Sequence, residues 1–108
     1  MDRHGDIALG FDVSGAVRYP SIRYAGRLSS DPLGQLPRGE VSIIEGNGAQ
    51  TGDDISFGDY SQMTVDPLDD CTFWYANTYY PRTAKSNIWH TRIAKFGIAL
   101  GGCQSGLP

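Results

Sequence analysis

The residues whose types suit ligand contact are aromatic rings, one aspartate and two arginines. Exposed rings stack on the faces of sugars, and arginine can clamp an anion. The same residue types also have structural roles, since rings fill cores and subunit interfaces and aspartates accept backbone N–H groups in turns. We favour the structural role for Asp59 and for the rings, and we expect the matched arginines to form structural ion pairs with turn aspartates. The candidates for ligand contact are Asp59, Tyr60, Trp74, Tyr75, Tyr79, Trp89, Arg23 and Arg92.

The sequence gives less evidence for catalysis or metal binding than for ligand contact. A glycosidase-type reaction needs two carboxylates that converge across a cleft, for which Asp59 with Asp66 or Asp69 are the candidates. The lone histidines at 4 and 90 have no second ligand at helical or hairpin spacing, and no nucleophile elbow or evident Cys–His pair is present. The aspartates lack the spacing of a calcium loop, so we interpret them as turn caps: Asp53, Asp54, Asp66, Asp69 and Asp70. We predict no cofactor, no metal and no catalytic residue.

The composition limits the kinds of partner that this protein is expected to bind. The 108 residues carry a net charge of −3, which argues against nucleic acid, and no window approaches the roughly 18 apolar residues of a membrane span. The amino-terminal stretch lacks the features of a signal peptide, so the sequence leaves the compartment open. Two cysteines, Cys71 and Cys103, are too few for a zinc site and are either buried thiols or one disulfide.

Alternating apolar residues predict an all-β fold of about six antiparallel strands in a single domain, 1–108. In "IALGFDV", Ile7, Leu9, Phe11 and Val13 share one face, which we expect to be the covered side. The stretch 88–98 also fits helical spacing, but its β-branched and aromatic content favours a strand. The glycine-rich stretch 46–52 lacks a P-loop lysine and is interpreted as a flexible hairpin loop.

Two segments of the chain resemble each other. Residues 2–11 match 66–75 at an offset of 64, and 21–28 match 90–97 at an offset of 69, with Arg23 against Arg92. We interpret the second copy as having five more residues in its loop. The two copies then cover approximately 2–46 and 59–98, and each reads as a turn, a strand, a loop and a strand carrying R-x-A.

The stretches "DRHGDIALGF", "YPSIRYAGRLSSDPLG", "GDYSQMTVDPLDDCTFWY" and "TRIAKFGI" resemble the C-terminal part of uncharacterised secreted bacterial proteins. Their repeats are read as β-propeller blades that open with a D-x-x-G turn. The family usually carries Arg-Trp before G-D-Y-S, where this chain has Ser56-Phe57. The resemblance implies a secreted origin and a disulfide between Cys71 and Cys103.

On this resemblance the chain makes one and a half propeller-like blades, which cannot close a ring of about four to eight. We therefore expect a homo-oligomer that covers its open edges, or a rearranged small sandwich or barrel. The functional hypothesis is a non-enzymatic β-sheet module with a structural or ligand-binding role, with a glycan or small polar molecule as ligand. The alternative is a carbohydrate-active hydrolase or glycan-binding fragment.

Overall fold

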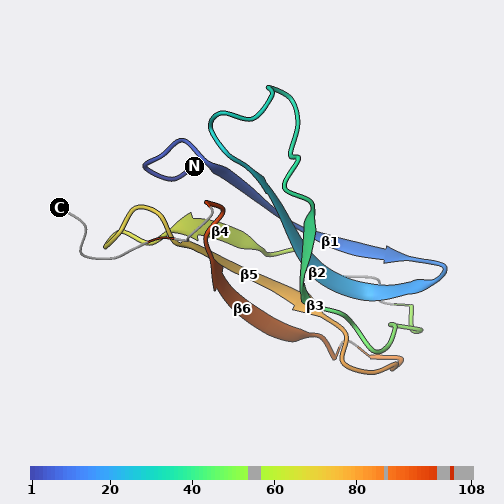
Figure 1. Cartoon of the computed structure of the whole chain (residues 1–108). Helices are drawn as coiled ribbons and strands as arrows, with labels where there is room; N and C mark the ends of the chain where they lie inside the picture. The colour runs from blue at the N-terminus through green and yellow to red at the C-terminus, as the bar shows by residue number, and fades with distance from the viewer. Residues whose placement is uncertain (54–56, 87, 100–102, 104–108) are drawn as a thin grey trace.

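The computed structural model describes residues 1–53, 57–86, 88–99 and 103. These residues form two three-stranded antiparallel sheets, in the orders β1-β2-β3 and β4-β5-β6 (Figure 1). The predicted all-β class is confirmed. The strands are β1 (Ile7–Gly15), β2 (Arg18–Arg27), β3 (Glu40–Ile44), β4 (Gln62–Val65), β5 (Phe73–Tyr79) and β6 (His90–Phe96).

The ambiguous segment near the C-terminus is a strand, as its composition predicts. β6 pairs with β5 over its whole length, from Phe73 opposite Phe96 to Tyr79 opposite His90. β-Branched and aromatic side chains pack well on such a pleated surface, which outweighs the helical spacing of a few apolar residues. Within the described ranges there is no helix long and apolar enough to cross a membrane.

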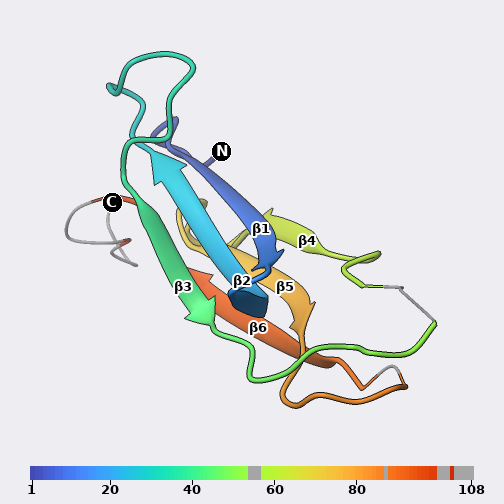
Figure 2. The same ribbon diagram turned by 90° about the vertical axis from the view of Figure 1, so that its right-hand side faces the viewer.

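The two sheets lie one over the other, and the core is the layer between β2 and β5 (Figure 2). Ile22 of β2 and Phe73 of β5 are almost completely buried. The ring of Tyr24 stacks on that of Phe96 with 3.7 Å between their centroids, and Phe96 in turn lies 5.8 Å from Phe73. These three rings join the sheets through β2, β5 and β6.

The predicted covered face of β1 is wrong. Gly10 lies against the ring of Tyr75, and Asp12 accepts a hydrogen bond from Asn77, so the even-numbered residues face the second sheet. Side chains alternate along a strand, so the apolar set that includes Leu9 and Phe11 faces away from that sheet. The physical reason is that the Tyr75 ring fills the volume that a β-carbon at position 10 would occupy, so only glycine fits there.

The glycine-rich stretch 46–52 is not a hairpin loop, because it connects one sheet to the other. It runs beside residues 80–85, where Asn47 N–H donates to the Tyr80 carbonyl and Thr51 N–H to the Ala84 carbonyl. A β-carbon at Gly48 or Gly52 would lie closer than 3.0 Å to the backbone of that neighbouring segment. The glycines therefore allow two backbones to approach closely.

The turns that precede β1 and β5 lie side by side. Arg3 N–H donates to the Asp70 carbonyl at 2.7 Å, which joins the first turn to the second. Next to this contact, Cys71 and Cys103 form a disulfide with 5.5 Å between their Cα atoms. The bridge attaches the chain after β6 to the start of β5, and it agrees with the pairing that the resemblance implies.

Candidate functional site

A pocket opens on the face of the β4-β5-β6 sheet that points away from the first sheet. Ala76 and Thr78 alternate with Tyr75 and Asn77 along β5, and they share their face with the opposing residues of β4 and β6. The segment 57–62 forms the other wall. The pocket has a volume of ≈ 680 Å³ and is lined by residues 57–62, 76–78, Trp89 and Thr91.

Three of the predicted ligand-contact residues meet in this pocket, namely Asp59, Tyr60 and Trp89. The Tyr60 side chain is 90% exposed and that of Trp89 is 42% exposed, so both rings are accessible to a ligand. Hydroxyl and amide groups of Ser61, Gln62 and Thr91 complete the wall, whereas the Thr78 hydroxyl is buried. Accessible rings beside a carboxylate and neutral polar groups suit a polar ligand with an apolar face, such as a sugar.

A buried polar network fixes the floor of the pocket. Asn77 is 3% exposed, and its side-chain amide donates to Asp12 Oδ1 at 2.7 Å and to the Tyr75 hydroxyl at 2.8 Å. Its Oδ1 accepts from the backbone N–H of Thr78 at 2.8 Å. Both amide protons are thereby used, which fixes the orientation of Asn77. Sequence reasoning missed this residue, although a polar side chain at an inward position between Tyr75 and Tyr79 was the available signal.

Asp12 lies behind the pocket wall, with its carboxylate against the backbone of Gly58. Gly58 has a φ of 70°, in the left-handed region that favours glycine. Burial raises the pKa of the Asp12 carboxyl from 3.8 to about 6, because a half-buried carboxylate loses hydration. This pKa shift makes the stability of the protein depend on pH.

Replacement of Asp12 by asparagine should stabilise the protein at neutral pH. The folded chain keeps the Asp12 proton up to about pH 6, whereas the unfolded chain loses it near 3.8, so the contribution of Asp12 to the free energy of unfolding falls as pH rises through this window. Asparagine removes the charge and retains the oxygen that accepts from Asn77. With the solvent exposure discounted, we expect a gain of about 1 kcal/mol at neutral pH that disappears below both pKa values. Urea unfolding at the two pH values measures it, and an equal gain at both would contradict the titration.

The other predicted aromatic residues lie outside the pocket. Trp74 is on the same face of the sheet, where its indole N–H donates to Asp66 Oδ2 at 3.1 Å and Lys95 Nζ lies 5.8 Å from the ring centroid. Tyr75 is buried between the sheets, as the core role predicts. Tyr79 packs edge-on against the His90 ring at 6.0 Å.

The two matched arginines differ in their surroundings. Arg23 pairs with Glu45 at 2.6 Å and with Glu40 at 3.1 Å, and the hydrogen bonds to Glu45 and then Glu40 raise the pKa of its guanidinium. The ion pair is structural, as expected, but its partners are these glutamates of the β3 region and not a turn aspartate. Arg92 is exposed on β6. The structure does not bring either arginine to the pocket.

The carboxylates proposed for hydrolysis do not converge. Asp59 precedes β4, whereas Asp66 follows it and accepts from the backbone N–H of Leu68 at 2.9 Å. Asp69 accepts from the Thr72 hydroxyl and from the N–H groups of Thr72 and Cys71, and these bonds lower the pKa of its carboxyl, the Thr72 hydroxyl most strongly. Turn capping is confirmed for both residues. Asp54 lies outside the described residues.

Comparison with protein-family models, with curated proteins and with solved structures gives no match to this chain. The fold and the site define the class of protein, which is a small all-β domain with an open aromatic and polar pocket on one sheet face.

Proposed function

We propose that this protein is a non-enzymatic β-sheet module that binds a small polar ligand, of the sugar type, in the pocket of Asp59, Tyr60 and Trp89. The observation that carries the proposal is the pocket itself, in which two accessible rings stand beside a carboxylate and neutral hydrogen-bonding groups. The rings would cover the apolar faces of a sugar ring. The Asp59 carboxylate would accept hydrogen bonds from its hydroxyls, and the neutral groups would donate to those hydroxyls or accept from them.

The rigid floor supports binding. Asn77 is fixed by three hydrogen bonds, and Thr78 is held by one of them. A site built on such fixed strand residues loses little conformational freedom when the ligand binds, which favours affinity. The pocket is also open, as recognition of one unit within a longer glycan requires.

The binding test is a titration with neutral mono- and oligosaccharides, followed by the fluorescence of the tryptophans and by calorimetry. We expect Trp89→Ala to weaken binding at least about tenfold, since truncation of an aromatic anchor costs about 2 kcal/mol and 1.4 kcal/mol is tenfold. Trp74→Ala is the matched control, because it removes the same ring from the same sheet face outside the pocket, and we expect a change within about twofold. Equal effects of the two substitutions, or no binding by the unmodified protein, would rule out this site.

Hydrolysis is the second candidate, and Asp12 is the observation in its favour. Its carboxyl has a pKa raised to about 6 and lies against Gly58, the residue before Asp59. A raised pKa suits a general acid. Asp59→Asn should then abolish release of reducing sugar, whereas a binding module releases none before or after the change. We favour binding because Asp12 does not line the pocket and because Asp66 and Asp69 are occupied in their turn.

We also propose that the two sheets derive from one repeated unit related to propeller blades. Leu9 pairs with Ala25 in the first sheet and Tyr75 pairs with Ala94 in the second, so equivalent positions are offset by 66 (75 − 9) and 69 (94 − 25) residues. These offsets also make the pair of Phe11 with Arg23 in the first sheet equivalent to the pair of Asn77 with Arg92 in the second. The offset rises from 64 in the turn before the first strand to 66 in that strand and to 69 in the second strand. The second copy therefore has two more residues between the turn and the first strand and three more between the two strands, whereas the sequence comparison placed all five in one loop.

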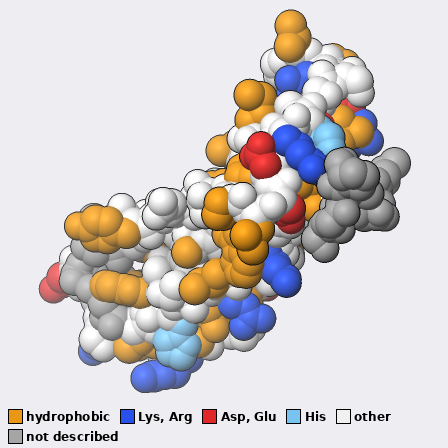
Figure 3. Space-filling model, turned by 90° about the vertical axis from the view of Figure 1, so that its left-hand side faces the viewer, with side chains coloured by type: hydrophobic (Ala, Val, Ile, Leu, Met, Phe, Trp, Pro, Cys, Tyr) orange, Lys and Arg blue, Asp and Glu red, His pale blue; other side chains and the backbone are white. Residues whose placement is uncertain are grey.

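The apolar face of β1 supports self-association. Leu9 is 50% exposed, and β1 is an edge strand of its sheet. Hydrophobic side chains reach the surface at several places on the molecule, as Figure 3 shows for one face. An edge strand with an exposed apolar face pairs readily with another chain. We propose that a second copy covers β1, which leaves the pocket on the other sheet accessible.

Association through β1 predicts that Leu9→Lys lowers the mass of the protein in solution from that of a dimer to that of a monomer, because a charge would be buried in the contact. The control is Val17→Lys, which adds the same charge at a side chain that is 97% exposed in the β1–β2 hairpin. Sedimentation over a range of concentrations measures both variants. A monomeric unmodified protein would contradict the proposal.

A further inference from the structure

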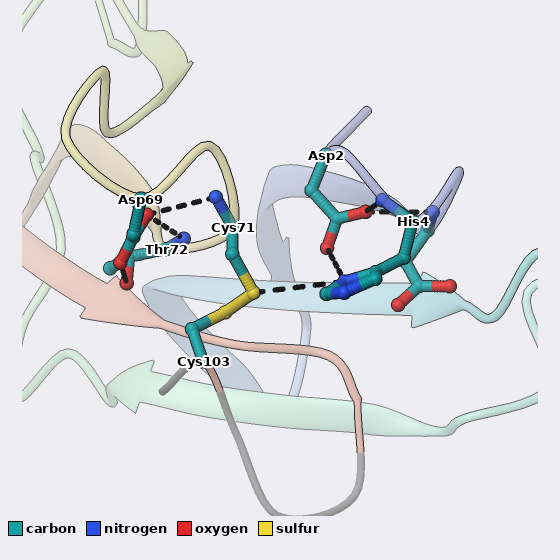
Figure 4. The surroundings of a disulfide bond; sticks show 7 residues. Asp2, His4, Asp69, Cys71, Thr72 and Cys103 are labelled. Carbon is teal, nitrogen blue, oxygen red and sulfur yellow. Dashed lines mark hydrogen bonds and ion pairs between the residues drawn. A yellow bond between two sulfur atoms is a disulfide. The ribbon is translucent and has the colours of Figure 1, made fainter. Parts of the chain in front are cut away.

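A cluster of possible metal ligands surrounds the disulfide. The side chains of Asp2 and His4 lie on one side of Cys71, and Asp69 and Thr72 on the other (Figure 4). His4 Nδ1 is 3.9 Å from Cys71 Sγ and 3.8 Å from Asp2 Oδ2. The ligand atoms of Asp2, His4 and Cys71 all lie within 4.8 Å of one another. The sequence separates Cys71 from this turn by more than half the chain, so only the fold brings them together. The expectation that two cysteines are too few for a zinc site did not count Asp2 and His4 as further ligands beside them.

The Asp2 carboxylate has one occupied and one unoccupied oxygen. Oδ1 accepts from the backbone N–H groups of His4 and Asp6, at 2.8 and 3.0 Å, and so holds the turn. Oδ2 is buried and accepts no hydrogen bond. A buried carboxylate oxygen without a hydrogen bond is costly, and it faces the imidazole and sulfur that border it. The turn is thus complete without Oδ2, which remains available to a ligand.

We propose that reduction of the Cys71–Cys103 disulfide turns this cluster into a zinc site with Cys71, Cys103, His4 and Asp2 as its four ligands. Tetrahedral zinc takes sulfur at about 2.3 Å and nitrogen or oxygen at about 2.0–2.2 Å, which puts neighbouring ligand atoms roughly 3.3–3.8 Å apart. The sulfur–nitrogen and nitrogen–oxygen separations here are 3.9 and 3.8 Å. The Cα separation of 5.5 Å allows both thiolates to face one ion.

Zinc binding at this cluster depends on the oxidation state of Cys71 and Cys103. In the disulfide neither sulfur carries the negative charge that binds zinc. A dithiol reductant supplies two electrons: one of its thiolates attacks a disulfide sulfur, the second releases the mixed disulfide, and the products are two protein thiols and one reductant disulfide. Zinc binding then displaces the two thiol protons. Cys71 is buried, whereas Cys103 is half-buried and the His4 side chain is 47% exposed, so a reductant and an ion can enter from the Cys103 and His4 side.

The test uses the full chain, reduced with a dithiol and freed of it by desalting without oxygen, and then titrated with Co²⁺ as a spectroscopic substitute for Zn²⁺. We expect one Co²⁺ per chain, with the thiolate-to-cobalt charge-transfer absorption of a tetrahedral site, and displacement by one Zn²⁺. The oxidised protein should show no such absorption. Zinc should also raise the unfolding temperature of the reduced protein and leave that of the oxidised protein unchanged.

Three variants test whether His4 and Asp2 bind the metal together with the cysteines, or whether the two thiolates bind it alone. His4→Gln and Asp2→Asn should each weaken metal binding at least roughly tenfold, since even outer partners of metal ligands contribute about 10–100-fold. Asparagine keeps the Oδ1 acceptor of the turn, so the fold is preserved. His90→Gln is the matched control and should bind metal as the unmodified protein does. Absence of the absorption in the reduced protein, or affinities that His4→Gln and Asp2→Asn leave unchanged, would overturn the proposal.

Discussion

Gly10→Val should lower the free energy of unfolding by about 3 kcal/mol, the largest effect that we expect from one substitution between the sheets. A β-carbon at this position would lie closer than 3.0 Å to three ring carbons of Tyr75, which is almost fully buried. The ring cannot move aside without disturbing Asn77, to which its hydroxyl is hydrogen-bonded. Urea unfolding followed by circular dichroism measures the loss.

Gly15→Val provides the control for this prediction. Gly15 ends the same strand, and a β-carbon there would meet nothing within 4 Å. Valine suits a strand, so we expect a change within about 0.5 kcal/mol. If the two valine variants unfold at the same urea concentration, the two sheets do not pack through Gly10 and Tyr75.

Cys103→Ser should lower the free energy of unfolding by about 3–4 kcal/mol, because it opens a loop with a sequence separation of 32. Without the bridge, the unfolded chain gains the freedom that the closed loop had removed. The measurement is thermal and urea unfolding of oxidised protein in the presence of a chelator, so that no metal compensates for the lost bond.

Cys71→Ser should be more destabilising than Cys103→Ser. Both substitutions open the same loop, but Cys71 is completely buried and the serine hydroxyl would have to be buried in its place. Cys103 is half-buried, so its replacement leaves a hydroxyl near water. Equal stability of the Cys103→Ser variant and the unmodified oxidised protein would show that the bridge does not constrain the chain.

Local sequence predicted much of the fold. The alternating and β-branched stretches became strands, including 90–96, where apolar spacing also allowed a helix. Asp66 and Asp69 cap the turn around Pro67, as the turn chemistry of aspartate predicts. These features depend on neighbours within a few residues, and the side-chain pattern records such neighbours directly.

The candidate site was predicted only in part. Asp59, Tyr60 and Trp89 meet in one pocket, but Trp74, Tyr75 and Tyr79 have other contacts. The hydrogen bond between Asp12 and Asn77 joins residues 65 positions apart. The local sequence around either residue does not predict this contact. The arrangement of His4 beside Cys71 is equally non-local.

By itself, the amino-acid sequence determined that this chain forms short antiparallel strands joined by aspartate and glycine turns, because backbone geometry and side-chain alternation act locally. Only the tertiary structure decided which face of β1 meets the second sheet. The Tyr75 ring requires the space above Gly10, so the more apolar face, which includes Leu9, turns outward. Packing between distant strands, and not hydrophobicity alone, selects the buried face and so places the pocket and the disulfide cluster.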